Sequence, residues 1–401
     1  MPNERAMLRR TLVGLAAAAG VLWAGAERAQ QACDDPQNLP NPVYLTVGDT
    51  QVNLVKALGK KLRDTENVTL IWVATGSCTN LDTLYNGTPL TGNLSYIPAA
   101  WDPRVMPTPP TCSVPMPGVP ADVANSIVFL GGCPSQKPDT VADSLGPVQS
   151  FVFVVPMASP AVAITAEEAY FVFGFGTPGG VTPWIDEKQL FIRPTTKGTI
   201  ISMGASIKVP AGKWKGVAVN LSPDLANMVA TSSSPQAALG ILGSEVHDGL
   251  RASLKALAFR AFGQYHAFFP DSTSTAFDRQ NVRDGHYQMW SYTHWLLTTD
   301  AQGTPVKPLA RRVIDLIVSN PVTPAASFEP IDTIAKVGLV PACAMKVQRS
   351  TEGGPYSPFD PAEPCGCYFE SLTGTTACTA CGDSKPACST GVCRHGYCEA
   401  H

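Results

Sequence analysis

The sequence predicts an α/β protein of two lobes, with mixed and mainly parallel sheets, followed by a small disulfide-rich C-terminal tail. Between residues 39 and 341, short apolar runs such as 69–74 and 150–156 alternate with segments of helical spacing such as 52–62. Strands that alternate with helices are typical of α/β folds with parallel strands. The 12 cysteines fall into one group in the first third of the chain and a second group near its C-terminus.

The individual elements follow from local patterns of apolar residues and from turn and capping residues. Thr165 and Glu168 have the spacing of a capping box, which predicts that a helix begins there. The expected strands are 43–47, 69–74, 125–130, 150–156, 189–193 and 287–297; the expected helices are 52–62, one from 81, 165–173, one from 198 and 308–319, with 234–242 a helix that leads into a strand.

The N-terminus has the order of a secretion signal. Arg5, Arg9 and Arg10 precede a mostly apolar run over 11–26, which is short for a membrane span and ends in small residues. We therefore expect residues 1–26 to be a signal peptide that directs the chain to the periplasm, the cell surface or the medium. An N-terminal membrane anchor is the alternative, and the arginine pair leaves the twin-arginine export route open.

The charge balance excludes one class of partner. The chain has 29 Lys and Arg against 32 Asp and Glu, with a net charge of −3, so nothing attracts nucleic acid electrostatically. The 36 prolines and 34 glycines indicate many loops. We expect a monomer that uses no cofactor.

The cysteines are interpreted as disulfides because an exported chain folds in an oxidising compartment. Each of the two groups has an even number, so each can close on itself, although the sequence does not select the pairs. Lipidation of Cys33 would leave one thiol unpaired, which makes a lipid anchor the weaker alternative. A Cys112–Cys133 bridge is one way to clip the proline-rich insertion 103–120. A zinc site of tail cysteines with His395 is an alternative that export disfavours.

Three predicted strand ends share one design, in which a β run is followed by a small or hydroxyl-bearing turn and then by a helix. A helix N-terminus offers free N–H donors and partial positive charge, so such turns can bind an anion. They converge at the carboxyl ends of the strands in an open α/β sheet. The alternative is that they serve only as caps and tight turns. The turns are Gly48-Asp49-Thr50, Gly76-Ser77-Cys78-Thr79 and Thr195-Thr196-Lys197-Gly198-Thr199.

Arg193 precedes the third turn and follows the apolar strand residues 190–192. A guanidinium at this place can bind an oxyanion through two parallel hydrogen bonds. Pairing with a nearby acid, Asp186 or Glu187, is the alternative that the local sequence leaves open.

At these residues the chain resembles the phosphate-binding proteins of ABC transporters, which have the two-lobed type II periplasmic binding protein fold. The resemblance extends over roughly residues 40 to 320. Its components are the turns 48–50 and 76–77, which look like ligand loops; 122–126, similar to an Asp-x-x-x-Ser strand end; 151–156 and 164–176, similar to a crossover strand and the helix after it; and Arg193 with Gly198 and Thr199, similar to an Arg-x-x-x-Ser-Gly-Thr clamp.

This resemblance implies a small, phosphate-like oxyanion held between the lobes and, as a partner, the permease of an ABC transporter. We expect lobe 1 over 34–150 and 285–342, lobe 2 over 151–284, and a separate cysteine-rich module over 343–401. The implied ligand contacts are Gly48, Asp49, Thr50, Gly76, Ser77, Cys78, Ser126, Arg193, Lys197, Gly198 and Thr199, with no metal ligand and no catalytic residue.

Three positions depart from the family pattern, and one of them is Cys78, which replaces a small residue in the second loop. Lys197 stands where the clamp has a serine, and Ile127 stands where the family places an aspartate that accepts a proton from the oxyanion. Both favour the alternative function, a secreted or surface interaction protein that keeps the fold without transport. An enzyme is disfavoured because the sequence has no Gly-x-Ser-x-Gly elbow and no His-Glu-x-x-His zinc motif.

Overall fold

The computed structural model describes residues 31–383, 385 and 387–399 of the chain. The signal peptide expected over 1–26 lies outside the described residues. No helix among the residues that the structure describes has the length and the apolar character needed to cross a bilayer.

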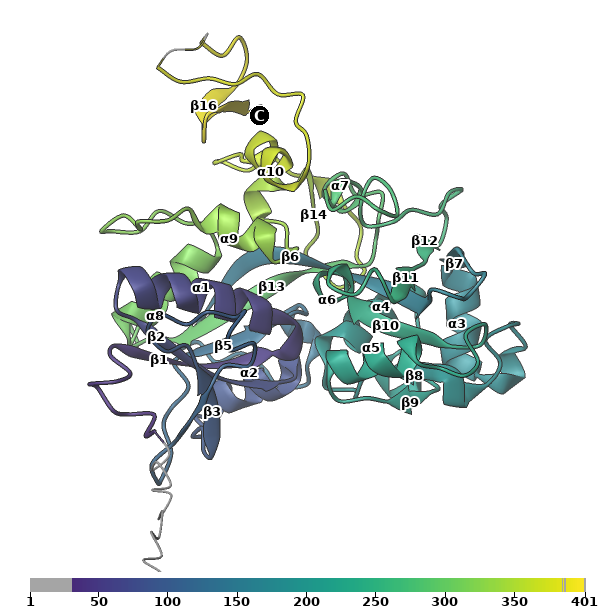
Figure 1. The fold of residues 1–401 in the computed structure, drawn as a ribbon, viewed down its shortest axis with the longest axis horizontal. Coiled ribbons are helices and arrows are strands. Elements are labelled where there is room, and N and C mark those ends of the chain that lie inside the picture. Colours follow the sequence, from purple (N-terminus) through teal and green to yellow (C-terminus); the bar gives the residue numbers. More distant parts are fainter. Residues whose placement is uncertain (1–30, 384, 386, 400–401) are drawn as a thin grey trace, which may run out of the picture. The chain divides into compact units, whose positions relative to one another are not determined.

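One 11-stranded sheet organises the described chain (Figure 1). Its order is β4-β3-β2-β1-β5-β13-β6-β10-β8-β9, and β11 also pairs with β6. On one side β1 is parallel to β2 and β5, and on the other β8 is parallel to β9 and β10, which confirms the predicted α/β class. The strands of this sheet are β1 Pro42–Gly48, β2 Thr69–Thr75, β3 Asn93–Tyr96, β4 Thr111–Ser113, β5 Val123–Ser126, β6 Val141–Pro156, β8 Leu190–Ile192, β9 Val217–Ala218, β10 Leu239–Gly243, β11 Leu254–Ala256 and β13 Trp290–Thr298.

Two long strands, β6 and β13, join the two sides of the sheet. They pair antiparallel with each other, while β13 also pairs with β5 and β6 also pairs with β10. Every residue of β6 from Gly146 to Pro156 is buried, as expected of a strand that is covered on both faces. Figure 1 shows β6 running from the half of the sheet that contains β1 to the half that contains β10.

Five helices each follow a parallel strand: α1 follows β1, α2 follows β2, α4 follows β8, α5 follows β9 and α6 follows β10. Because neighbouring parallel strands end at the same edge, the helices of each side also begin at one edge. The helices are α1 Val52–Thr65, α2 Ser77–Tyr85, α3 Ala166–Phe175, α4 Gly198–Ile207, α5 Ser222–Ala230, α6 Ser244–Asp248, α7 Gln280–Arg283, α8 Pro308–Ile317, α9 Pro330–Lys336 and α10 Gly366–Thr373. Short strand pairs complete the fold: β7 Ala163–Thr165 with β12 Ala258–Arg260, β14 Val347–Gln348 with β15 Ser357–Pro358, and β16 Val392–Arg394 with β17 Tyr397–Glu399.

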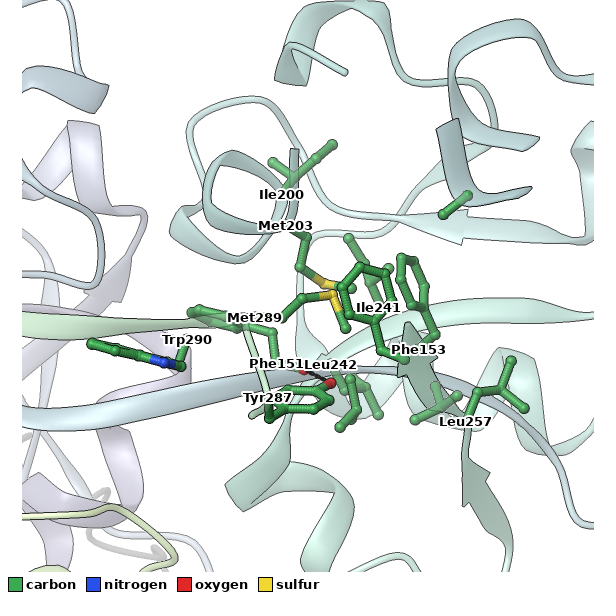
Figure 2. Close-up of a cluster of buried hydrophobic side chains, with 14 of the residues drawn as sticks. Phe151, Phe153, Ile200, Met203, Ile241, Leu242, Leu257, Tyr287, Met289 and Trp290 are labelled. Carbon is green, nitrogen blue, oxygen red and sulfur yellow. Dashed lines mark hydrogen bonds between the residues drawn. The ribbon is translucent and has the colours of Figure 1, made fainter. Parts of the chain in front are cut away.

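The larger hydrophobic core surrounds β6 and β10 (Figure 2). Phe153 stacks on Phe173 of α3 with ring centroids 5.6 Å apart. The buried hydroxyl of Tyr287 donates to the carbonyl oxygen of Phe151 at 2.5 Å. The one polar atom of this side chain is therefore hydrogen-bonded inside the core. A second core contains residues of α1, α8, β1 and β2.

Most sequence-predicted elements are present, with shifted ends. The capping box forms, since Thr165 Oγ1 accepts from Glu168 N at 3.1 Å and Glu168 Oε2 accepts from Thr165 N at 2.8 Å. The strand expected over 125–130 is wrong beyond Ser126, because the Ser126 hydroxyl bonds the amide and the carbonyl of Val128 and closes a turn. The helix expected to begin near 81 begins at the second ligand turn instead, at Ser77.

All 12 cysteines form disulfides, and each of the two groups closes on itself as expected. The expected Cys112–Cys133 clip is wrong, because Cys112 on β4 lies beside Cys33, whose amide donates to Ser113 O at 2.9 Å. With its sulfur in this bridge, Cys33 has no thiol to carry a lipid. The bridges are Cys33–Cys112, Cys78–Cys133, Cys343–Cys365, Cys367–Cys378, Cys381–Cys393 and Cys388–Cys398.

The tail is fixed by polar contacts as well as by disulfides. The buried carboxylate of Glu399 accepts hydrogen bonds from the amides of Cys367 and Tyr368, both at 2.9 Å, and so satisfies free donors in the first turn of α10. The hydroxyl of Tyr368 donates to Asp332 of α9 at 2.5 Å, which ties α10 to the body.

We predict that Glu399→Ala loosens the first turn of α10. Losing a helix cap costs about 1 kcal/mol, so the Cys367 and Tyr368 amides should exchange with deuterium roughly five- to tenfold faster. The matched control is Glu363→Ala, since the exposed Glu363 side chain in the same tail pairs with Arg394 and bonds no α10 amide. Unchanged protection of both amides in Glu399→Ala would contradict the assignment.

Candidate functional site

The ends of β1 and β8 bring together two of the three predicted turns. Arg193 Nη2 lies 2.7 Å from Asp49 Oδ2, and Lys197 Nζ lies 3.5 Å from Asp49 Oδ1. The Arg193 side chain is 1% exposed and that of Asp49 is 11% exposed, so the ion pair is shielded from water. The alternative of a local partner for Arg193, Asp186 or Glu187, is therefore wrong.

Arg193 is held by three acceptors. Besides Asp49, its guanidinium donates to Ser222 Oγ at 2.6 Å and to Asn220 O at 2.8 Å. These acceptors lie on the segment that follows β9 and on the first residue of α5. A buried guanidinium needs such partners because its donors are costly to leave unpaired.

Ser222 completes the cradle for the Asp49 carboxylate. Its backbone amide donates to Asp49 Oδ2 at 3.1 Å, and its hydroxyl donates to the same oxygen at 2.9 Å. A carboxylate on the first amide of a helix is stabilised by the helix dipole. Sequence reasoning missed Ser222, although the Ser-Pro-Asp start of α5 is a recognisable helix N-terminus.

Electrostatics keeps Asp49 ionised. Burial favours the neutral carboxyl, but the charges of Arg193 and Lys197 outweigh burial and hold the pKa of Asp49 below its ordinary value. Burial also lowers the pKa of Lys197, an effect that Asp49 opposes and Arg193 reinforces. The ammonium of Lys197 donates to Thr75 O at 2.8 Å, which places it at the carboxyl end of β2.

The Asp49 carboxylate is surrounded by donors. Its two oxygens meet a guanidinium, an ammonium, a helix-terminal amide and a hydroxyl, which are groups that also bind phosphate and carboxylate ligands. The prediction that Asp49 contacts a ligand stays a prediction.

The second predicted turn adjoins this cluster through close backbone contacts. A Cβ on Gly76 would lie 2.7 Å from Thr196 O, so only glycine allows the two turns to approach. Ser77 Oγ accepts from the amide of Ile127 at 3.1 Å. The Ile127 side chain lies against the start of α4, since a Cβ on Gly198 would be 2.2 Å from Ile127 Cγ1. An apolar side chain therefore covers the α4 N-terminus.

The remaining predicted contacts are engaged elsewhere. Ser126 bonds within its own turn, Cys78 is bridged to Cys133, and the Gly48 amide donates to Asn125 Oδ1 at 3.3 Å. Thr199 is buried at the start of α4. Among the predicted ligand contacts, the charged groups that meet are those of Asp49, Arg193 and Lys197.

A second polar network crosses the sheet through Gln149 of β6. Gln149 Oε1 accepts from Gln51 Nε2 at 2.5 Å and from Thr50 Oγ1 at 3.3 Å, while its Nε2 donates to Glu245 Oε1 at 3.0 Å. It connects the start of α1 with the start of α6. Sequence reasoning did not select Gln149, although a lone amide side chain in an apolar strand is a visible signal of a buried polar contact.

A C-terminal segment also bridges the two sides. Glu352 Oε2 accepts from the Phe129 amide at 2.8 Å and from Ser291 Oγ at 3.2 Å. The neighbouring Gly353 packs against Ala205 of α4, because its Cβ would lie 3.2 Å from that residue. Asp49 and Gln149 thus form polar links between the two sides, while segment 352–353 contacts Phe129 and β13 through Glu352 and contacts α4 through Gly353.

Comparison with solved structures identifies the fold. No protein-family model matches the chain, and no curated protein is significantly similar to it in sequence. A phosphate ABC transporter substrate-binding protein from Clostridium perfringens, solved with bound phosphate, aligns with 75% of this chain and 100% of its own at TM-score 0.52 and 11% identity. An ABC-type phosphate transport receptor from Vibrio cholerae aligns with 74% of this chain and 99% of its own, at TM-score 0.46 and 15% identity.

The likeness to the Clostridium perfringens protein extends over the whole of that protein and concerns the fold. The tail disulfides Cys367–Cys378, Cys381–Cys393 and Cys388–Cys398 form a further feature of this chain. The described chain therefore has the two-lobed type II periplasmic binding protein fold, with a disulfide-rich C-terminal region.

Proposed function

We propose that the chain is an exported solute-binding protein that holds a small, phosphate-like oxyanion between two lobes, 34–150 with 285–342 and 151–284. One observation carries this proposal: a guanidinium that is 1% exposed and a nearby ammonium share a single carboxylate, at the start of a helix. The oxyanion would take over the contacts that Asp49 makes with Arg193, Lys197 and Ser222.

Binding requires that Asp49 leave. Two anions cannot share one guanidinium at close range without strong repulsion, so the ligand competes with the carboxylate for Arg193. The entering oxyanion also needs the lobes to part, because both cations are buried. Only the molecules in which Asp49 is withdrawn from Arg193 can bind the ligand. The apparent affinity is therefore the intrinsic affinity multiplied by the fraction of such molecules.

The proposed location is extracytoplasmic. Six disulfides require an oxidising compartment, and the expected signal peptide would supply the route. We propose no catalytic role, since the fold-level likeness is to a solute-binding protein. An ABC transporter permease is the proposed partner.

The competing proposal is a secreted or surface interaction protein in which the cleft stays shut. Three observations favour it: the Asp49 carboxylate pairs with both cations, Ile127 covers the start of α4, and segment 352–353 contacts both Phe129 and α4. In this case the anion-binding groups serve only to hold the lobes together.

Titration calorimetry with inorganic phosphate and sulfate separates the two proposals. We predict that Asp49→Ala binds at least one of these anions about tenfold or more tightly than the wild type, because the internal competitor is gone. Arg193→Ala should abolish binding, because the guanidinium supplies the main charge. The control Arg312→Ala removes a partly buried arginine that pairs with Glu66 away from the cluster, and should bind as the wild type does. If neither the wild type nor Asp49→Ala binds either anion at micromolar levels, the oxyanion proposal fails and the interaction protein is favoured.

Anion rescue of stability gives an independent prediction. Asp49→Ala leaves Arg193 buried without its charge partner, which should lower the free energy of unfolding by about 3–5 kcal/mol. Adding phosphate or sulfate should restore part of this loss in urea denaturation, since a ligand that binds the folded state stabilises it. The control Asp315→Asn removes a more exposed pair with Arg311 and should cost less than about 1 kcal/mol. If Asp49→Ala does not fold, Asp49→Asn is used. A loss that no anion reverses would argue against an oxyanion site.

The ion pair also predicts a pH dependence. Because the pKa of Asp49 is lowered in the folded state, the pair stabilises the protein above the ordinary aspartate pKa of about 4 and loses this effect as the pH falls through the lower folded value. The stability difference between wild type and Asp49→Asn should therefore be constant near neutral pH and shrink below about pH 4. A difference that is independent of pH would show that Asp49 is not ionised in the fold.

A further inference from the structure

A separate cavity of about 970 Å³ lies among α1, α6 and α9. These helices are labelled around the middle of β6 in Figure 1. None of Asp49, Arg193, Lys197 and Ser222 lines the cavity, so it is distinct from the cluster described above. Its volume is at the upper end of the range for small-molecule sites.

The floor of the cavity contains a buried carboxyl group. Glu245 is 6% exposed, and its Oε1 accepts from Gln149 Nε2 at 3.0 Å. Its Oε2 is buried and has no hydrogen-bond partner among the described residues. Burial raises the pKa of Glu245 to about 8, which favours the neutral carboxyl near neutral pH, so this residue adds little negative charge to the lining.

The other acidic groups in the lining are already engaged. Asp248 pairs with Arg251 and with Arg279, and Asp332 accepts from the hydroxyl of Tyr368. Glu329 accepts from the amide of Ile331 at its own helix start and has its other oxygen near His395. The arginines compensate the charge of Asp248, whereas the hydrogen bonds of Asp332 and Glu329 leave two carboxylates beside α9.

The lysines of the lining are mostly unpaired. Lys60 pairs with Asp64, whereas the described residues offer no ion-pair partner to Lys56, Lys61 or Lys336. Lys56 and Lys60 are four residues apart on α1 and so lie on one face of that helix. The three lysines without an ion-pair partner outnumber the two carboxylates beside α9, and Lys56 and Lys61 lie on α1 instead, so the α1 side of the cavity favours an anionic ligand.

Aromatic side chains supply apolar walls. Trp101, Phe277 and Phe328 line the cavity, and the Trp101 side chain donates its indole N–H to Met106 O at 2.9 Å, which fixes the ring. Trp101 is 6% exposed, whereas Phe328 is half-buried and Phe277 is 49% exposed. An inorganic anion would leave the two phenylalanine rings uncovered, and a ligand with an aromatic or other flat apolar body would bury them.

We propose that this cavity binds a small organic anion, with its flat apolar body against Phe328 and its acidic group near Lys56. This site goes beyond the oxyanion function proposed above and does not depend on it.

The test uses titration calorimetry on the full exported chain with three probes. 2-Naphthoate carries the ring and the negative charge, 2-naphthylmethylamine carries the ring and a positive charge, and inorganic phosphate carries charge without a ring. We expect 2-naphthoate to bind one site per chain. The amine should bind at least tenfold more weakly, and excess phosphate should leave the 2-naphthoate isotherm unchanged.

Charge reversal locates the site. Lys56→Glu should weaken 2-naphthoate binding about tenfold or more, and Lys61→Glu, at an exposed position on the same helix, serves as a second variant if the first does not fold. The control Lys213→Glu reverses an exposed lysine outside the lining and should leave the affinity within about twofold. The proposal is overturned if 2-naphthoate does not bind at millimolar levels, if the amine binds equally well, if neither α1 variant weakens binding, or if excess phosphate displaces 2-naphthoate, which would place the ligand at the oxyanion cluster instead.

Discussion

The arrangement of this site depends on one ion pair, Arg193 with Asp49. The two residues come from opposite sides of the sheet, 144 positions apart, and meet at 2.7 Å with the guanidinium almost fully removed from water. Moving a guanidinium out of water is costly, and only a charged, well hydrogen-bonded partner repays most of that cost. The Asp49 carboxylate is that partner, and it also accepts from the amide and the hydroxyl of Ser222 at the start of α5.

This constraint explains how neighbouring features fit together. Ser222 contributes an amide and a hydroxyl to the same carboxylate oxygen, so the start of α5 is positioned by the pair. Glycine at position 76 allows the second turn to approach the third, and Ile127 lies over the start of α4. This cluster of one carboxylate and two cations can be a gated binding site or a permanent clasp. The two differ only in whether Asp49 can be displaced.

Part of this could be predicted from the sequence. Apolar spacing located α1 and the buried strands, and Thr165 with Glu168 identified the start of α3, because these features depend on neighbours within a few residues. The turns and Arg193 were predicted as an anion site from local sequence patterns as well. The partner of Arg193 could not be predicted, because pairing between distant strand ends depends on the order of strands in the sheet. The local sequence offered only Asp186 and Glu187 as partners. Cysteine parity predicted closure within each group but could not choose the Cys33–Cys112 bridge for the same reason.

The central claim is that the Asp49 carboxylate occupies the position of an oxyanion ligand. Crystal structures of the wild type and of Asp49→Ala, grown with inorganic phosphate, test this claim most directly. The account predicts phosphate bonded to Arg193 and to the Ser222 amide in Asp49→Ala, at the place that the carboxylate fills in the wild type without ligand. Phosphate bound elsewhere, or an Arg193 that recruits another side chain and leaves no anion at this position, would contradict it.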